Sequence, residues 1–173
     1  EDLRRLSSLR SQPMKIWYLS FVLTAACSSS ATPEQPLPFS HAVHTGQQGI
    51  ACVACHEGSK TRAQAGLPSI GICLSCHMRP QGTITVNDQV VRERAALGGA
   101  FRWVQVTRNP GHVYFSHRAH TVFAKMNCSE CHGEVSTWAE PPTQPKQELV
   151  DMAACMSCHR QRGASNECKT CHR

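Results

Sequence analysis

The sequence contains few aromatic residues: five Phe, three Trp and two Tyr make up 6% of its 173 residues. So small a supply of large side chains excludes an ordinary apolar core for a chain of this length. The longest apolar stretch, residues 16–26, is shorter than the roughly 20 residues that cross a bilayer as a helix. The formal net charge is +6, but no stripe of Lys and Arg alternates with aromatic residues, and nucleic acid is therefore not an expected partner.

Cysteine and histidine are abundant, with eleven Cys and ten His. Ten of the cysteines form five Cys-x-x-Cys-His motifs, at residues 52–56, 73–77, 128–132, 155–159 and 168–172, which we number sites 1 to 5 in chain order. The paired cysteines are Cys52 and Cys55, Cys73 and Cys76, Cys128 and Cys131, Cys155 and Cys158, and Cys168 and Cys171. The motif histidines are His56, His77, His132, His159 and His172.

This motif is the attachment signature of c-type haem. Two thiols at this spacing reach the two vinyl groups on one edge of a porphyrin, while the adjacent imidazole turns beneath the ring to bind iron. The sequence therefore predicts five covalently bound haem c groups. Because so few residues surround each haem, the porphyrins themselves are expected to form the core. The expected fold is mainly α with much irregular structure, with short helices around stacked haems.

The histidines outside the motifs match the predicted irons in number. They are His41, His44, His112, His117 and His120. Since bis-histidine ligation needs one further ligand for each iron, we predict that these five histidines complete the five haems. A six-coordinate iron has no vacant position for a substrate, which favours electron transfer and assigns no residue a catalytic role.

Three alternatives compete with parts of this interpretation. A zinc ribbon or a disulfide framework also uses paired cysteines, but zinc sites take the pairs two at a time and five is an odd number. His112 lies in an Asn-Pro-Gly-His sequence outside any repeat, so it is alternatively an exposed loop histidine. A methionine would then complete one haem and raise its reduction potential. The methionines near motifs are Met78, Met126, Met152 and Met156.

An internal repeat organises the chain. Residues 39–44 read FSHAVH and residues 115–120 read FSHRAH, and in both copies a motif cysteine follows the second His by eight positions. Histidines at this spacing lie about one helical turn apart and can serve two different irons. The Phe before them is expected either to pack on a porphyrin face or simply to start the helix. The predicted units are a dihaem unit at 39–80, a linking insert at 81–111 and a trihaem unit at 112–173.

The linking insert carries no haem motif. A helix is expected from about residue 87 to 97, with Asn87 and the Asp after it as the cap and a Gly pair at its end. Residues 101–107 alternate as in a short strand. The insert is either a docking surface or a flap over a haem edge, and Trp103, together with Trp138 in a later proline-rich loop, is a candidate contact with a partner.

Residues 1–26 have the proportions of a secretory signal, with basic positions followed by an apolar stretch. Residues 23–27 read LTAAC and resemble a bacterial lipobox, followed by a flexible tether within 27–38. Cys27 is the one cysteine outside the motifs, and we predict that it carries a lipid. Leu23 stands four positions before it rather than the usual three, which leaves an ordinary cleaved signal or an uncleaved anchor as alternatives.

The Phe-x-His-x-x-His element followed by Cys-x-x-Cys-His resembles the class III multihaem cytochromes c. Residues 65–68 (AGLP), 91–93 (VRE) and 113–117 (VYFSH), with five haem motifs, look like the pentahaem subunit of alternative complex III, over about residues 38–172. The resemblance implies that His41 serves site 1 and His117 serves site 3.

The same resemblance implies a cytochrome at the periplasmic side of the cytoplasmic membrane. The family subunit is usually held there by a transmembrane segment, whereas in this chain the predicted lipid at Cys27 is the expected anchor. Its expected partners are integral-membrane and iron–sulfur subunits of a quinol-oxidising respiratory or photosynthetic complex, and a redox partner cytochrome. The alternatives are a free lipoprotein electron shuttle, a soluble periplasmic or secreted protein, or a subunit of an extracellular haem filament. A multihaem reductase is less expected, because it needs an open iron, often marked by Lys in place of a motif His.

Overall fold

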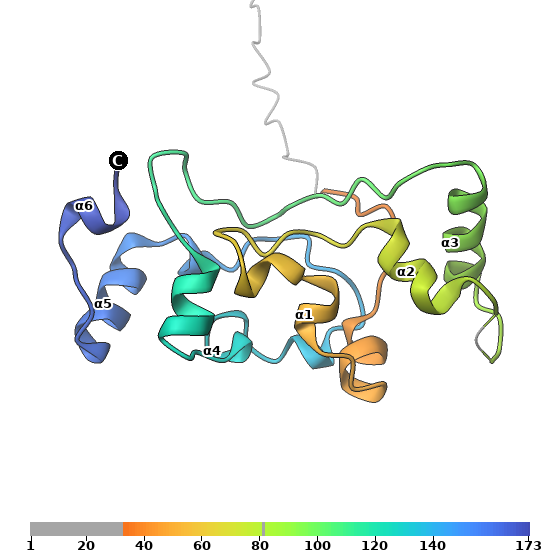
Figure 1. Ribbon diagram of the computed structural model, residues 1–173, viewed down its shortest axis with the longest axis horizontal. Coiled ribbons are helices and arrows are strands. Elements are labelled where there is room, and N and C mark those ends of the chain that lie inside the picture. The colour runs from red at the N-terminus through yellow and green to blue at the C-terminus, as the bar shows by residue number, and fades with distance from the viewer. Residues whose placement is uncertain (1–32, 81) are drawn as a thin grey trace, which may run out of the picture. The chain divides into compact units, whose positions relative to one another are not determined.

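Short helices separated by irregular backbone make up the chain in a computed structural model that describes residues 33–80 and 82–173 (Figure 1). These residues belong to one unit, Thr32–Arg173. Its α-helices are α1 (Cys52–Cys55), α2 (Ile70–His77), α3 (Val86–Ala96), α4 (Cys128–His132), α5 (Met152–Arg162) and α6 (Cys168–Cys171). The single turns of other kinds are the π-helical η1 (Ala42–Gln47) and η3 (Ala119–Phe123), and the 3-10 turns η2 (Glu57–Lys60), η4 (Val135–Thr137) and η5 (Gln147–Leu149).

The described residues contain no β-strand, and one isolated bridge pairs Val113 with His172. The predicted fold class, mainly α with much irregular structure, is confirmed. Within the same ranges no helix has the length and hydropathy to cross a membrane. The predicted signal segment and the lipid attachment at Cys27 lie outside the described residues.

Each haem motif forms or ends a helical turn. α1, α4 and α6 begin at the first cysteine of sites 1, 3 and 5, while α2 and α5 contain the motifs of sites 2 and 4. In site 1 the peptide N–H of His56 donates to the Cys52 carbonyl at 2.9 Å, and His172 makes the same bond to Cys168 at 2.9 Å. Because residues i, i+3 and i+4 share one side of a helix, this turn presents both thiols and the imidazole together.

The two copies of the repeat adopt the same backbone conformation. Each forms a π-helical turn, a form that is often found at functional sites. In each copy the Ser before the first His accepts a backbone N–H, and the Thr after the second His donates to the carbonyl of the first. These bonds are Val43 N–H to Ser40 Oγ (3.2 Å), Thr45 Oγ1 to His41 O (2.9 Å), Ala119 N–H to Ser116 Oγ (3.3 Å) and Thr121 Oγ1 to His117 O (3.0 Å).

The expected helix in the insert is present as α3, but its cap differs from the expected one. Thr85 has an extended backbone, and its hydroxyl accepts the N–H of Asp88 at 3.1 Å. Asn87 lies inside the helix and its side-chain amide donates to the Pro38 carbonyl at 3.1 Å. The C-terminal end agrees with the expectation, since Gly98 follows the helix with a φ of +64°.

The predicted strand at residues 101–107 is wrong. No second strand lies beside it to complete a ladder in the described ranges, and a side chain takes the place of a partner. The Gln35 amide accepts the N–H of Val104 at 3.1 Å and donates to its carbonyl at 2.9 Å. The segment is therefore held in an extended but irregular conformation.

The insert supplies two of the three buried members of a small apolar cluster between α2 and α3. Its buried members are Leu37, Val91 and Phe101, exposed by 7%, 4% and 8%, the only buried hydrophobic residues that the structure describes. Around them pack Ile70, Cys73, Leu74, Val90 and Trp103. So small a core agrees with the expectation that haem groups supply the apolar interior. We conclude that the insert is a packing element beside site 2.

Both tryptophans that were candidate partner contacts are half-buried inside the unit. Trp103 donates its indole N–H to the Pro68 carbonyl at 3.1 Å and meets the Phe39 ring edge-on at 6.2 Å. Trp138 meets the His41 ring edge-on at 6.1 Å. These contacts give both residues a packing role next to the first His-x-x-His element.

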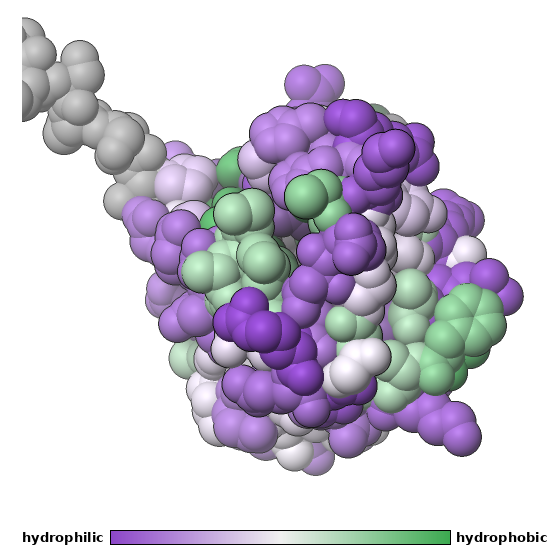
Figure 2. Space-filling view, turned by 90° about the vertical axis from the view of Figure 1, so that its left-hand side faces the viewer, coloured by the Kyte–Doolittle hydropathy of each residue, from purple (hydrophilic) through white to green (hydrophobic). Residues whose placement is uncertain are grey.

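The surface is mostly hydrophilic on the face that Figure 2 shows, and hydrophobic residues form small separate groups there. Several large apolar side chains in the described ranges are exposed, among them Leu97 at 85%, Met78 at 71% and Phe123 at 66%. Protein atoms alone therefore leave much apolar surface uncovered.

Candidate haem-binding sites

The structure places a non-motif histidine opposite the motif histidine at four sites. The ring centres are 6.0 Å apart for His44 and His77, 6.4 Å for His117 and His132, 6.2 Å for His120 and His159, and 5.6 Å for His112 and His172. At site 1 the imidazole of His41 lies near that of His56: burial lowers the pKa of His41, and the charges of His56 and His44 lower it further. Four sites thus have a motif imidazole facing one from elsewhere in the chain, and at site 1 the two are neighbours.

The separations match the space that an iron ion needs between two imidazoles. A ring nitrogen binds a metal at about 2.0–2.1 Å, and the ring centre lies roughly 1.1 Å behind that nitrogen, so two rings on opposite sides of one iron have centres about 6.2 Å apart. The four measured values run from 5.6 to 6.4 Å. The ring planes meet at angles from 4° to 54°, which rotation about a common nitrogen–iron–nitrogen axis permits.

Most of these imidazoles are oriented by a hydrogen bond from the ring nitrogen Nδ1. Such a bond fixes the tautomer, so that Nδ1 carries the proton and Nε2 keeps its lone pair for a metal. Five of the partners are backbone carbonyls: Ser40 for His44 (2.8 Å), Gly66 for His56 (2.7 Å), Ala63 for His117 (2.9 Å), Ser116 for His120 (2.8 Å) and Ser165 for His159 (2.7 Å).

The phenylalanine of each repeat packs on the imidazoles rather than away from them. Phe39 stacks on His44 with ring centres 4.3 Å apart and meets His41 edge-on at 5.0 Å. Phe115 stacks on His120 at 4.6 Å and meets His117 edge-on at 4.9 Å. Each Phe thus holds the two distal imidazoles of its copy at a fixed angle. A contact with a porphyrin face stays a prediction.

None of the motif cysteines forms a disulfide in the part of the chain that the structure describes, and all are half-buried or exposed. They are therefore open to thioether formation with a porphyrin. No group of three or more His, Cys, Asp or Glu in the described ranges is arranged around a single metal position. A haem iron would take at most two protein ligands, and the facing imidazoles could supply two at four of the sites.

Comparison with known proteins agrees with this geometry. The family model described as "Cytochrome c7 and related cytochrome c" matches residues 113–173, which hold sites 3 to 5. The multihaem cytochrome c subunit of menaquinone reductase from Nitratidesulfovibrio vulgaris is 30% identical over 162 residues, covering 81% of this chain and 77% of the relative.

The chain belongs to the multihaem cytochrome c family. Members of this family carry covalently bound haem c and transfer electrons, so this cytochrome is an electron-transfer protein and not an enzyme in its own right. Haem c would fit the facing imidazoles and the accessible cysteine thiols described above, and it would supply a one-electron centre at each site that it occupied.

Distant segments of the cytochrome bring site 1 beside site 3. The backbone N–H and Nδ1 of His117 both donate to the Ala63 carbonyl at 2.9 Å. Thr121 donates to the Ser59 carbonyl at 2.7 Å. Burial raises the pKa of the Cys128 thiol, and the charge of the Cys52 thiol and a hydrogen bond with it raise it further.

The other neighbouring sites follow from the imidazoles and thiols that lie near each other. In the first repeat His41 lies near His56 of site 1 and His44 faces His77 of site 2, and in the second repeat His117 and His120 face the motif histidines of sites 3 and 4. Burial raises the pKa values of the thiols of Cys55, Cys131 and Cys155. In each case a cysteine of the adjacent site raises the pKa further: Cys76 for Cys55, Cys158 for Cys131, and Cys171 for Cys155. The five sites therefore adjoin in the order 2, 1, 3, 4, 5, with α2 and α6 far apart in the unit (Figure 1).

His41 differs from the other distal histidines because its Nδ1 is buried without a hydrogen-bond partner. Burial lowers the pKa of this imidazole, and the nearby His56 and His44 lower it further. His41 is therefore held neutral, the form that binds a metal ion. His132 has a lowered pKa for the same reasons, burial first and then His117.

His112, the least expected ligand from the sequence, is held at site 5 by backbone pairing. Tyr114 N–H donates to the Cys171 carbonyl at 2.7 Å, and Arg173 N–H donates to the His112 carbonyl at 3.2 Å. These bonds frame the isolated bridge between Val113 and His172. His112 itself is exposed in a turn, as a loop histidine would be, and its ring lies nearly parallel to that of His172, 16° from it.

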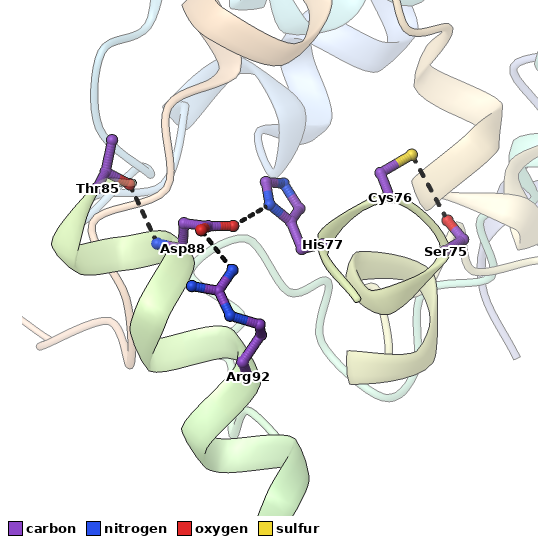
Figure 3. A network of polar contacts seen from close by, with 6 residues as sticks. All are labelled: Ser75, Cys76, His77, Thr85, Asp88 and Arg92. Atoms are coloured by element: carbon purple, nitrogen blue, oxygen red, sulfur yellow. Dashed lines mark hydrogen bonds and ion pairs between the residues drawn. The ribbon is translucent and has the colours of Figure 1, made fainter. Parts of the chain in front are cut away.

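Sequence reasoning missed one residue beside the sites. Asp88 of α3 accepts the Nδ1–H of His77 at 2.7 Å and is ion-paired with Arg92 (Figure 3). The hydrogen bonds with Arg92 and then with His77 hold the pKa of this carboxyl below its usual range. Its place near the start of a helix had suggested only a capping role, and no local pattern links it to a motif eleven residues earlier.

Proposed function

We propose that the cytochrome carries five bis-histidine haems and relays electrons for a quinone-linked membrane assembly at the periplasmic side. The observation that carries this proposal is that four motif histidines face a non-motif histidine with ring centres 5.6 to 6.4 Å apart, and that the fifth, His56, lies near His41. The proposed ligand pairs are His41 with His56, His44 with His77, His117 with His132, His120 with His159, and His112 with His172.

The order in which the sites adjoin supports a relay. Sites 2 and 5 are the ends of the series, and each intermediate site has a neighbour on both sides. Covalent attachment through two cysteines per site keeps neighbouring groups at a constant separation through each redox cycle. We propose that donor and acceptor proteins contact the cytochrome near the two ends.

The related subunit supports a quinone-linked assembly. That protein is named as part of a menaquinone reductase, and the resemblance to alternative complex III noted above also links the chain to quinone chemistry, in the direction of quinol oxidation. We therefore propose integral-membrane and iron–sulfur subunits as partners, without choosing a direction of electron flow. A filament subunit that borrows an axial histidine from the next copy is less favoured, because each site has two imidazoles from one chain.

Haem counting tests the first part of the proposal. Purified holoprotein is expected to contain five haems by pyridine haemochrome and intact mass, all low-spin by magnetic circular dichroism. His44→Ala should keep five covalent haems and make one of them high-spin. Gln47→Ala, an exposed position in the same turn η1, should leave all five low-spin. Unchanged spectra in His44→Ala would remove His44 from the ligand set.

Purification from native membranes in mild detergent tests the second part. Polytopic quinone-reactive subunits that travel with the cytochrome would support the proposed assembly, whereas the cytochrome alone would favour a free lipoprotein shuttle. The lipid at Cys27 is tested separately, because Cys27→Ser should abolish a lipid-sized mass increment and weaken membrane association. An unchanged mass in this variant would refute the lipid anchor.

A further inference from the structure

Site 2 differs from the other sites in the partner of its motif histidine. His77 donates its Nδ1–H to the carboxylate of Asp88 at 2.7 Å, whereas His56 and His159 donate to neutral backbone carbonyls. His44, on the opposite side of site 2, also donates to a carbonyl. Within the described residues, site 2 is thus the one place where a candidate iron ligand is bonded to an anion.

Asp88 is built into this position from several sides. Its carboxylate lies in the middle of a short network (Figure 3). One oxygen accepts the Nδ1–H of His77, and the other is paired with Arg92, one helical turn later in α3. Its own N–H is capped by Thr85 at 3.1 Å. The residue is only 7% exposed, so water screens its charge weakly and the interaction with His77 is stronger than a surface contact would be.

We propose that Asp88 is a positioning residue that lowers the reduction potential of the haem at site 2, and that Arg92 limits this effect. The proposal rests on the proposed occupancy of site 2 by haem. A carboxylate that accepts the Nδ1–H of a ligating imidazole fixes the ring and makes Nε2 a stronger donor. Stronger donation and a buried negative charge both favour the ferric over the ferrous state, which lowers the potential.

Arg92 opposes this effect because its positive charge partly neutralises Asp88. The two residues therefore have opposite predicted effects on one haem, although each also joins the same network between α2 and α3. A purely structural role would make both substitutions act in the same direction. The linking insert, which carries no haem motif, thereby acquires a function: it sets the potential at one end of the series of sites.

The test is a potentiometric titration of the five-haem holoprotein, followed by absorbance and by electron paramagnetic resonance. Asp88→Asn keeps the size of the side chain and an oxygen acceptor but removes the charge, and it is expected to shift one of the five midpoint potentials upward. Arg92→Gln is expected to shift the same one downward. Asp88→Glu should restore most of the wild-type value.

Asp151→Asn is the matched control. Asp151 also lies at the start of a helix beside a motif, but its carboxylate accepts only the backbone N–H groups of Ala153 and Ala154. Because Asp151 makes no bond to a motif imidazole, this variant should leave the potential that Asp88→Asn shifts unchanged, and any effect of the lost charge should be confined to the haem at site 4 and be smaller. To assign the shift to site 2, Asp88→Asn is repeated with His44→Gly, where the affected haem becomes high-spin and is titrated separately.

Two results would overturn the inference. One is a set of five unchanged potentials in Asp88→Asn with all haems bound, and the other is a shift of the same sign in Asp88→Asn and Arg92→Gln. The proposed function has a different point of failure. A wild-type haem count below five or a high-spin wild-type haem would contradict the ligand pairs before any potential is compared.

Discussion

Replacing His112 tests the ligand that the sequence left least certain. In His112→Gly the imidazole is lost, but the backbone groups that pair this segment with site 5 remain, including the N–H of Tyr114 on Cys171 at 2.7 Å and the carbonyl that accepts from Arg173 at 3.2 Å. The ring removed lies 5.6 Å from the centre of the His172 ring and 16° from parallel to it. The substitution therefore vacates one iron position with little change to the fold.

The expected magnitude follows from the count of motifs. One of five haems should become high-spin, so about a fifth of the low-spin signal should be lost while the haem content stays constant. Magnetic circular dichroism and electron paramagnetic resonance measure the two spin states, and pyridine haemochrome measures the content. Added imidazole should bind in the space left by the ring and restore the low-spin signal. Arg108→Ala, an exposed position in the same loop, is the control.

The reasoning is refuted if His112→Gly keeps five low-spin haems without added imidazole. In that case another side chain, such as one of the methionines near the motifs, would be the ligand of one iron. Loss of a haem from His112→Gly, rather than a change of spin state, would contradict the claim that the backbone pairing at site 5 survives.

Three further predictions concern the chain itself. Lys125 has a φ of +54°, and the equivalent position in the other repeat is Gly49 with a φ of +65°. Lys125→Gly should therefore stabilise the holoprotein by about 1 kcal/mol in thermal unfolding, whereas the control Ala124→Gly should not stabilise it. Equal melting temperatures of Lys125→Gly and the wild type would contradict this prediction. Gly58→Ala should lower the melting temperature, because the added Cβ would lie 2.3 Å from the carbonyl oxygen of Gln64. Gly71→Ala should be tolerated, because its Cβ would meet nothing closer than the Ser69 hydroxyl at 3.6 Å. A lower melting temperature for Gly71→Ala than for Gly58→Ala would refute the packing argument. Cys52→Ala combined with Cys55→Ala should reduce the haem content from five to four and destabilise the fold around site 1, and a variant that still holds five haems would exclude that site.

Features that depend on neighbouring residues were predictable from the sequence. The five motifs, the five further histidines, the repeat and the helix of the insert follow from patterns a few residues long. The π-helical conformation of the repeats and the cap of α3 by Thr85 could not be predicted, because both depend on small differences in backbone geometry. The expected strand at 101–107 failed because strand formation needs a partner strand, which alternation alone does not supply.

By itself, the sequence determined what chemistry the chain can perform, because thioether attachment and the adjacent iron ligand require residues at fixed local spacing. The resemblance had implied places for His41 and His117, but only the tertiary structure decided which motif histidines His44, His112 and His120 face and in which order the sites adjoin. Those relations join residues distant in the chain, such as His117 and Ala63, 54 positions apart. The same holds for Asp88, whose role depends on α3 packing against α2. A contact of this kind is set by how helices pack, and no local spacing encodes it.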